Sequence, residues 1–391
     1  MVALVGVICA YFIRWKEAPL SAVDLPGLVA GIEKDAEEYL STRDEATLMV
    51  GLSVRGERRV RSFRSPGAEQ ARLPDADTIY EIGSVSKVFS TTVLAALEAQ
   101  GLIALDDPIA AHLPKELRLP EHIASITIEQ LATHNSGLGS VGAIHQAFID
   151  EELRGTEPPF AAYTHYLRYK KEHLYADLET AELVYPTGQG WTYSVIGMGT
   201  LGHILELVAG RPYEELLKET VCAPLGLADT GYTLSPEQQG RVMHAYDATG
   251  QPCPNWYHDV MLPQGGLRST MTDLLTFVEA NLAAGAEDGG PVLSRAMRRA
   301  REQYFAVPGG FTMPDGSDVP DFVQGLGWRG LTHPEGLAWW HGGTTLFYLA
   351  SAGVDDRAGV GVATVYSGRR ALVERDELHA LEREWFLRAC Q

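Results

Sequence analysis

The sequence has few cysteines, and their spacing carries no metal or redox motif. They are Cys9, Cys222, Cys253 and Cys390, with no CxxC pair and no Cys/His spacing among them. This pattern indicates neither a zinc site nor a disulfide framework, and we expect no metal and no cofactor. One pairing stays open, because Cys222 and Cys253 can form a disulfide if the protein is exported.

Basic residues are also scarce. The chain has 32 Lys and Arg against 51 Asp and Glu, which gives a formal net charge of -19. A protein with this large negative net charge is not expected to bind nucleic acid or an anionic membrane. We therefore expect no nucleic-acid partner, and the sequence leaves the oligomeric state open.

No apolar run is long enough to cross a bilayer, which takes about 20 residues. The longest candidate, residues 1–13, is nearly continuously apolar and is followed by Arg14 and Lys16. It suits the core of a signal peptide, although no basic residues precede it and no small-residue cleavage site is clear. We interpret residues 1–20 as the remnant of an export signal or anchor, with a packed N-terminal strand as the alternative. An exported, periplasmic or membrane-anchored protein is expected, a cytoplasmic one stays open, and membrane association is expected only through residues 1–13.

The remaining 371 positions, residues 21–391, show strand patterns near both ends and helical patterns between them. Alternation and β-branched or aromatic content predict strands, and apolar periodicity predicts helices. Strands are predicted at 48–54, 58–63, 324–331, 337–341, 346–352 and 360–366, and helices at 25–40, from Ser84 to about 97, 128–133, 199–209, 213–220, 271–281 and 371–387. This order favours an α+β fold with one antiparallel sheet assembled from both chain ends, flanked by helices. The sheet region is predicted at about 25–83 and 260–391, with an inserted all-helical region at about 88–259. Residues 155–185 are polar and tyrosine-rich, and fit a lid, a pocket wall or a surface helix.

The most informative pair is Ser84 and Lys87, in the stretch YEIGSVSKVFS. Residues three apart on a helix share a face, so the amine can lie against the hydroxyl. A serine needs an adjacent base to act as a nucleophile, and a lysine serves only if its pKa is lowered by burial or charge. The apolar residues that follow Lys87 provide such burial. Alone, the pair also fits a helix start with Ser84 as N-cap and Lys87 in solvent.

Two further segments carry polar residues next to glycines. The first, residues 185–195 (YPTGQGWTYSV), is a Gly/Pro loop that leads into a helix and contains Tyr193. The second, residues 339–345 (WWHGGTT), is a strand that ends in glycines, where another backbone or a ligand can approach closely. Alone, Tyr193 and His341 are better explained as a buried tyrosine with one hydrogen bond and a core histidine.

With these three segments the sequence resembles the serine β-lactamase and penicillin-binding-protein superfamily, and most of all its class C β-lactamase, esterase and D-aminopeptidase branch. The resemblance runs from about residue 30 to the C-terminus. It includes residues 126–138 (ITIEQLATHNSGL), 223–230 (APLGLADT) and 265–270 (GGLRST). It implies a β-lactamase/transpeptidase-like fold.

The resemblance also implies roles for individual residues. Ser84 matches the nucleophile and Lys87 the lysine of the SxxK motif, and Tyr193 matches the tyrosine of the second motif. Residues 341–344 match the third motif, so His341, Gly342 and Gly343 would line the substrate site. The backbone N–H groups of Ser84 and Thr344 would form the oxyanion hole, typically worth about 3 kcal/mol per donor.

Two departures from the family pattern bear on the substrate. The second motif usually reads Tyr-x-Asn, and Val195 stands where the Asn would contact a substrate amide. The third motif has His341 where β-lactamases have Lys, and a neutral imidazole holds a carboxylate poorly. The sequence therefore predicts a serine hydrolase that forms an acyl-enzyme from an ester, amide or peptide without an essential carboxylate. A carboxylesterase is the first choice, and a D-aminopeptidase, a DD-peptidase-like enzyme, a weak β-lactamase, acyl transfer to another acceptor and a non-catalytic binding protein are the alternatives.

Overall fold

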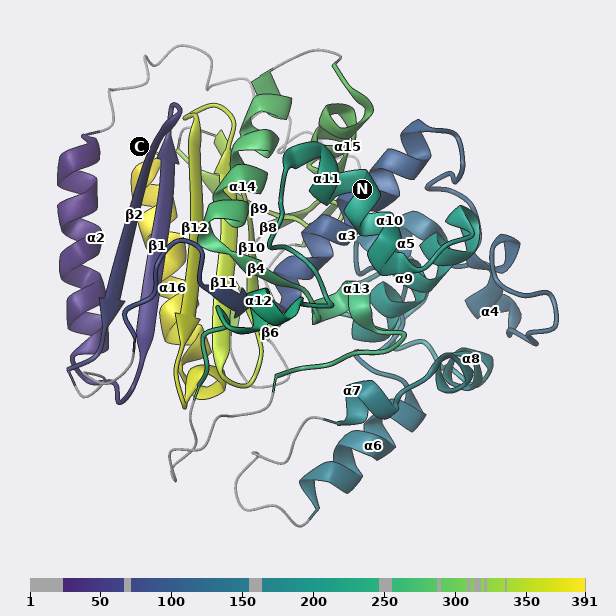
Figure 1. Cartoon of the computed structure of the whole chain (residues 1–391). Coiled ribbons are helices and arrows are strands. Elements are labelled where there is room, and N and C mark those ends of the chain that lie inside the picture. Colours follow the sequence, from purple (N-terminus) through teal and green to yellow (C-terminus); the bar gives the residue numbers. More distant parts are fainter. Residues whose placement is uncertain are drawn as a thin grey trace.

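The computed structural model of the chain describes residues 24–66, 72–154, 164–245, 255–286, 290–307, 311–312, 318–319, 322–334 and 336–390. Within these residues the main sheet has eight strands in the order β2-β1-β12-β11-β10-β9-β8-β5 (Figure 1). Every pairing between them is antiparallel. The strands are β1 (Thr47–Val54), β2 (Glu57–Arg64), β5 (Phe305–Val307), β8 (Phe322–Gln324), β9 (Arg329–His333), β10 (Gly336–Thr344), β11 (Tyr348–Asp355) and β12 (Val360–Ser367).

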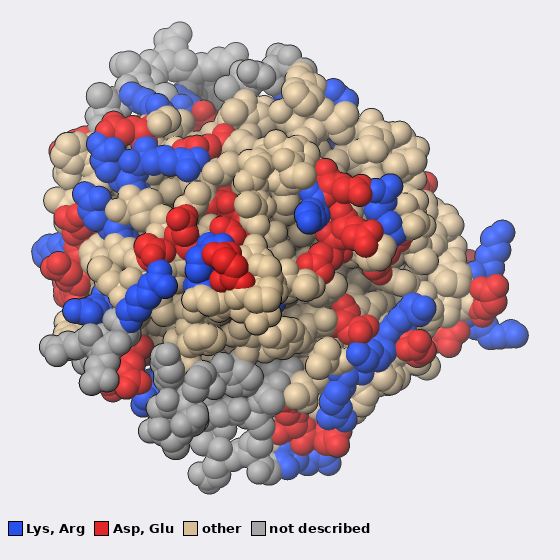
Figure 2. All heavy atoms as spheres, in the orientation of Figure 1, with Lys and Arg blue, Asp and Glu red and all other residues tan. Residues whose placement is uncertain are grey.

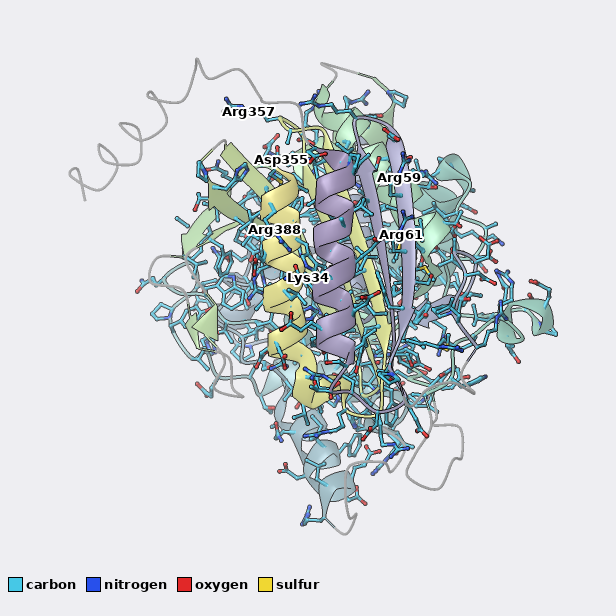
Figure 3. The ribbon with its side chains drawn as sticks, turned by 90° about the vertical axis from the view of Figure 1, so that its left-hand side faces the viewer. Lys34, Arg59, Arg61, Asp355, Arg357 and Arg388 are labelled. Atoms are coloured by element: carbon cyan, nitrogen blue, oxygen red, sulfur yellow. The ribbon has the colours of Figure 1, made fainter. Side chains whose placement is uncertain are left out.

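The predicted sheet built from both chain ends is confirmed, because β1 lies between β2 and β12. Strands β1, β11 and β12 are buried along their whole length, since helices cover both faces. On one face α2 (Leu25–Leu40) and α16 (Ala371–Ala389) lie side by side (Figure 3). On the other face, α14 (Met271–Ala286) packs on β11 and β12. Alternate residues of β1 point into the two cores: Leu48, Val50 and Leu52 into one, and Met49 into the other.

The helices between the two sheet segments form the second part of the fold. The longest are α3 (Ser86–Ala99) and α9 (Val195–Ala209), and both are largely buried. Helices α5 (Ile128–Ala132), α10 (Tyr213–Leu217) and α13 (Leu262–Gly265) pack on α9, and α15 (Val292–Ala300) packs against α3. The other helices are α4 (Glu121–Ala124), α6 (Ala143–Leu153), α7 (His165–Arg168), α8 (Lys171–Glu179), α11 (Ala223–Leu225) and α12 (Pro236–Gln239). Two short ladders lie outside the main sheet, β3 (Ile79–Glu81) with β4 (Arg268–Thr270) and β6 (Phe311–Thr312) with β7 (Asp318–Val319). The boundary of the helical region at 88–259 stays a prediction.

Two sequence-based predictions are wrong in detail. Residues 324–331 were expected to be one strand, but β8 ends at Gln324 and β9 begins at Arg329, because the chain turns at Gly327 with φ +71°. The helix expected over 213–220 changes geometry after Leu217, where a π-helical turn (Lys218–Cys222) begins. Apolar periodicity continues through both breaks, so it could not reveal them.

Several predictions fall partly or wholly outside the described residues. The apolar segment 1–13, residues 155–163 of the tyrosine-rich stretch and Cys253 all do so. Cys222 is a free, buried thiol among the described residues. None of the described helices is both long and apolar enough to cross a membrane. On the face shown in Figure 2, acidic and basic side chains lie interspersed over the described surface.

Candidate active site

The turn between β3 and α3 exposes Ser84 and buries Lys87. Gly83 has φ +48°, a conformation that favours glycine, and it starts a 3-10 turn (Gly83–Val85) that continues into α3. The Ser86 hydroxyl donates to the Gly83 carbonyl at 2.6 Å and accepts from the Leu267 N–H at 3.1 Å. These bonds fix the start of the helix. Ser84 is therefore held, partly exposed, beside the first turn of a buried helix.

The amine of Lys87 lies directly against the Ser84 hydroxyl. The distance from Lys87 Nζ to Ser84 Oγ is 3.0 Å, and the amine also donates to the Gln264 carbonyl at 2.5 Å. The Lys87 side chain is 0% exposed. Burial lowers the pKa of Lys87, because an ammonium loses its hydration there. The SxxK prediction thus has the spacing and the desolvation that it requires.

Tyr193 is carried to the same point by the loop ahead of α9. Ser194 caps this helix by accepting from the Gly197 N–H at 3.0 Å, and its own N–H donates to His134 Nδ1 at 3.1 Å. The His134 ring lies 4.8 Å from the Tyr193 ring, centroid to centroid. The Lys87 amine lies 4.7 Å from the centroid of the Tyr193 ring. Both Lys87 and Ser84 interact with the phenol in the sense that lowers its pKa.

A second cation, Arg329, lies beside the phenol. Its guanidinium carbon is 5.2 Å from the centroid of the Tyr193 ring and 5.7 Å from that of Trp191, and the residue is 9% exposed. In the described part of the chain no carboxylate pairs with it. Burial alone would raise the pKa of Tyr193, but the charges of Lys87 and Arg329 and the hydrogen bonds from Lys87 and Ser84 outweigh it, so the pKa lies below its usual value. The phenol and the amine titrate as a pair, and either can take the Ser84 proton.

The edge of β10 closes the site, and glycines allow the close approach. A Cβ on Gly343 would lie 2.0 Å from the Ile82 carbonyl oxygen and 2.9 Å from the Ser84 nitrogen. A Cβ on Gly83 would lie 2.6 Å from the Thr344 nitrogen. The backbones of Ser84 and Thr344 are therefore packed together, as two N–H donors of one oxyanion hole require. No larger residue fits at position 343 without moving this edge.

His341, Gly342 and Val195 lie around this centre without adding charge to it. His341 is 1% exposed, and its Nδ1–H donates to the Gly342 carbonyl at 2.7 Å. Burial first, and then the charges of Arg329 and Lys87, hold the pKa of His341 well below its usual range, so the imidazole is neutral. Val195 is 9% exposed and packs in the larger hydrophobic core. Direct substrate contact by these residues stays a prediction.

Two residues of this site were missed from the sequence. Arg329 follows Gly327 and a buried tryptophan in what was expected to be one continuous strand, so no spacing linked it to Tyr193. His134 lies within the quoted stretch 126–138, and its φ of +60° marks a tight turn. Its pKa is held well below the usual range by burial and by the charge of Lys87, so its neutral Nδ1 can accept from Ser194. The signal available in the sequence was a histidine within the quoted stretch 126–138. Its hydrogen-bond partner, Ser194, lies 60 residues further along the chain, so the pairing could not be predicted.

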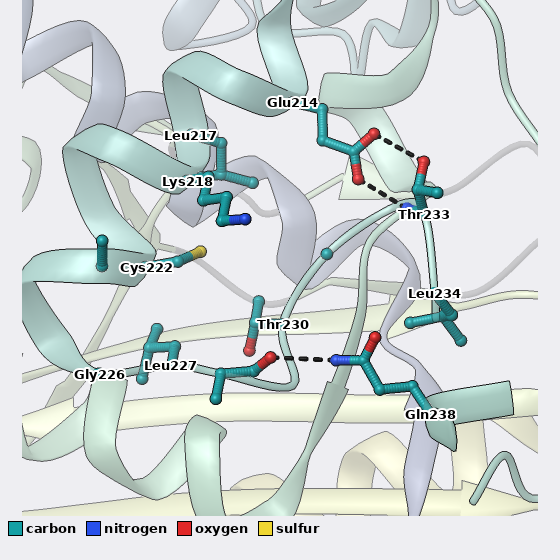
Figure 4. Close-up of a pocket in the computed structure, with 13 residues that line it drawn as sticks. Glu214, Leu217, Lys218, Cys222, Gly226, Leu227, Thr230, Thr233, Leu234 and Gln238 are labelled. Carbon is teal, nitrogen blue, oxygen red and sulfur yellow. Dashed lines mark hydrogen bonds between the residues drawn. The ribbon is translucent and has the colours of Figure 1, made fainter. Parts of the chain in front are cut away.

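Two other features of the described residues do not belong to this centre. Ligand atoms of His333, Asp355 and Cys390 lie within 4.8 Å of one another, and His333 Nε2 is 2.9 Å from Asp355 Oδ2. Burial raises the pKa of the Cys390 thiol, which keeps it protonated and a poor metal ligand. A cavity of about 350 Å³ lies around Glu214 and Cys222 (Figure 4). None of the predicted site residues lines it, and the Glu214 carboxylate already accepts from the Thr233 N–H and hydroxyl.

The sequence of this chain is similar to those of several known proteins. The model of the Beta-lactamase family matches residues 32–384. The D-alanyl-D-alanine-carboxypeptidase/endopeptidase AmpH of Escherichia coli K12 is 31% identical over 301 residues, which cover 74% of this chain and 71% of AmpH. A beta-lactamase of Lysobacter lactamgenus is 25% identical, over 78% of this chain and 70% of its own length.

Solved structures show the same fold. A beta-lactamase/D-alanine carboxypeptidase from Pseudomonas syringae has a TM-score of 0.72 at 18% identity, covering 92% of this chain and 99% of its own. A class C beta lactamase from Rhodobacter sphaeroides has a TM-score of 0.65 at 22% identity, covering 90% and 99%. At these identities the likeness establishes the fold, and the family match over most of the chain establishes the membership. The chain belongs to the beta-lactamase family of serine hydrolases.

Proposed function

We propose that this protein cleaves an ester or amide through an acyl-enzyme on Ser84, and that its preferred substrates carry no essential carboxylate. The observation that carries the proposal is the meeting of one hydroxyl with one buried amine and one phenol: Ser84 Oγ lies 3.0 Å from Lys87 Nζ, and that amine lies 4.7 Å from the centroid of the Tyr193 ring. A base at hydrogen-bond distance is what a serine nucleophile needs.

The chemistry follows from this arrangement. The Ser84 oxygen attacks the substrate carbonyl while its proton passes to the Lys87–Tyr193 pair, and the developing oxyanion is held by the N–H groups of Ser84 and Thr344. Collapse breaks the carbonyl bond to the alcohol or amine, which takes the proton from the pair. A water then attacks the ester on Ser84, gives a proton to the same pair and releases the acid, with the serine reprotonated.

A carboxylesterase is our first choice of substrate class. Both positions that anchor a charged or amide-rich substrate in the family pattern are altered, since Val195 offers only apolar surface and His341 is buried and neutral. Loss of a positive anchor weakens binding of a substrate carboxylate, while acyl transfer itself depends on Ser84 and its bases.

A peptidase acting on D-alanyl peptides is the second candidate. The identity of 31% with AmpH, a D-alanyl-D-alanine-carboxypeptidase/endopeptidase, supports it. The same machinery would cleave the peptide bond, and Arg329 supplies positive charge close to Tyr193. Export to the periplasm fits this substrate and remains part of the proposal.

The test is turnover by wild type and by Ser84→Ala. The wild type is expected to hydrolyse p-nitrophenyl butyrate, and Ser84→Ala is expected to lose this activity by more than about a thousandfold, as for removal of a nucleophile. Unchanged turnover in Ser84→Ala would refute the proposal. A D-alanyl-D-alanine peptide and a cephalosporin, assayed alongside, decide between the two substrate classes by their kcat/KM.

A further inference from the structure

A chain of buried hydrogen bonds runs from the helix α16 to the oxyanion-hole residue Thr344. Thr344 Oγ1 lies 3.3 Å from His379 Nε2, and His379 Nδ1 lies 2.6 Å from a carboxylate oxygen of Glu382. Glu382 is 0% exposed and His379 is 7% exposed. Buried polar groups of this kind cost free energy unless they are paired, so the folded protein favours the arrangement in which each of them has a hydrogen-bond partner.

The Glu382 carboxylate fixes the direction of the hydrogen bonds that it accepts. An ionised carboxylate only accepts, and the Glu382 oxygens accept from the Thr364 hydroxyl and from His379 Nδ1–H. The Thr364 oxygen lies 2.8 Å from the Ser351 hydroxyl, which supplies its next proton. A neutral imidazole with its proton on Nδ1 has a lone pair on Nε2. With the imidazole neutral, the Thr344 hydroxyl is the proton source for this contact and donates to His379.

The His379 ring also fills the space beside the third motif. It meets the Trp340 ring edge-on at 5.5 Å between centroids, and its Cε1 lies 3.0 Å from where a Cβ on Gly342 would stand. The ring thus occupies room that a side chain at position 342 would take. Thr344 is partly exposed at the end of β10, next to Gly343, whose backbone packs on Ser84.

With its one proton committed to His379, the Thr344 oxygen can offer only lone pairs to a bound substrate. We propose that the His379–Glu382 pair makes Thr344 an acceptor beside the oxyanion hole, so that this subsite selects a substrate N–H or O–H group and disfavours a carboxylate. The inference rests on the proposed acyl-enzyme chemistry at Ser84 and narrows its substrate class. His379 and Glu382 are positioning residues, because they act through Thr344.

The first test reverses the direction of the hydrogen bonds between Glu382, His379 and Thr344. In Glu382→Gln the amide can donate to His379 Nδ1, which moves the imidazole proton to Nε2 and frees the Thr344 proton for a bound substrate. The probes are two aryl esters of one acyl group, one with a meta-carboxamide and one with a meta-carboxylate on the leaving phenol. Wild type should favour the carboxamide ester in kcat/KM, and Glu382→Gln should shift this ratio toward the carboxylate ester by about tenfold, the value of one hydrogen bond to a charged group.

Two further variants control this result. In Thr344→Val the ratio should lose its dependence on position 382, so that adding Glu382→Gln changes nothing more. His379→Phe keeps the ring beside Trp340 and frees the Thr344 proton, so it should shift the ratio in the same direction as Glu382→Gln. An equal effect of Glu382→Gln on both esters, or the same shift in the Thr344→Val background, would overturn the proposal.

The second test reads the imidazole directly and needs no turnover. In the nitrogen NMR spectrum of the histidine-labelled full chain, the His379 signals are assigned by their loss in His379→Phe from those of the 12 histidines. Wild type should show a protonated Nδ1 and an unprotonated Nε2, and Glu382→Gln the reverse. A wild-type Nε2–H would overturn the inference whatever the activity, whereas activity retained in Ser84→Ala would overturn only the proposed function and leave this reading intact.

Discussion

Replacing Arg329 should change the pH dependence of activity more than its maximum. The guanidinium carbon lies 5.2 Å from the centroid of the Tyr193 ring, and no carboxylate among the described residues neutralises it. Coulomb's law at an effective dielectric constant near 20 gives about 3 kcal/mol for unit charges at this separation, or about two pKa units. The phenolate oxygen lies off the ring centre, so we expect a shift of about one to two units.

The assay is the pH profile of kcat/KM for p-nitrophenyl butyrate, which has no titratable group of its own. In Arg329→Met the acidic limb of the profile should shift to higher pH by about one to two units. The reason is that the positive charge of Arg329, which lowers the pKa of the Tyr193 phenol, is removed. Arg329→Lys is the matched control, since it keeps a cation at this position. Thermal unfolding of each variant shows whether the packing against Trp191 is preserved.

Two outcomes would refute the reasoning. If folded Arg329→Met kept the wild-type profile, the guanidinium would not act on the base. If Arg329→Lys moved the limb as far as Arg329→Met, the effect would come from lost stacking and not from lost charge.

Three further predictions concern other positions. Burial raises the pKa of Glu81 to about 7, above its unfolded value, so the native state binds this proton more tightly. The free energy of unfolding should therefore fall by about 3 kcal/mol as the pH rises from about 4.5 to 7. Glu81→Gln should abolish this fall, as measured by urea unfolding at several pH values. Gly343→Ala should lower kcat by at least about a hundredfold, because its Cβ would push the strand edge from Ser84; Gly31→Ala, whose Cβ meets nothing nearer than 3.7 Å, should stay active, and equal losses would contradict this account. Val195→Asn should raise kcat/KM for a cephalosporin by about tenfold with little change for the ester, as a restored amide contact would; parallel changes for both substrates would argue against it.

The sheet could be predicted because its buried strands are rich in apolar, β-branched and aromatic residues, a composition typical of strands. The patterns at 48–54 and 360–366 gave two strands that pair along their whole length, with Val50 opposite Thr364. The pattern could not reveal the turn that separates β8 from β9. There a Cβ added to Gly327 would lie 3.1 Å from the Lys87 carbonyl oxygen, so the turn packs closely against a segment about 240 residues away in the sequence.

Site residues that lie close together in the sequence could be predicted, whereas residues that only tertiary packing brings to the site could not. Ser84 and Lys87 meet because they are three apart on one turn, and their pairing followed from the sequence. Arg329 and His379 come to the site through the order of strands and the packing of a helix on the sheet. Neither stands in a recognisable motif, and only the folded chain brings them to Tyr193 and Thr344.

Covalent labelling tests the central claim most directly. A fluorophosphonate reacts with a serine that an adjacent base has activated, and peptide mapping by mass spectrometry locates the adduct. We predict one adduct, on Ser84, and about a hundredfold slower labelling in Lys87→Ala, because the hydroxyl loses its closest base. An adduct on another residue, or labelling of Ser84 at the same rate without Lys87, would contradict the account.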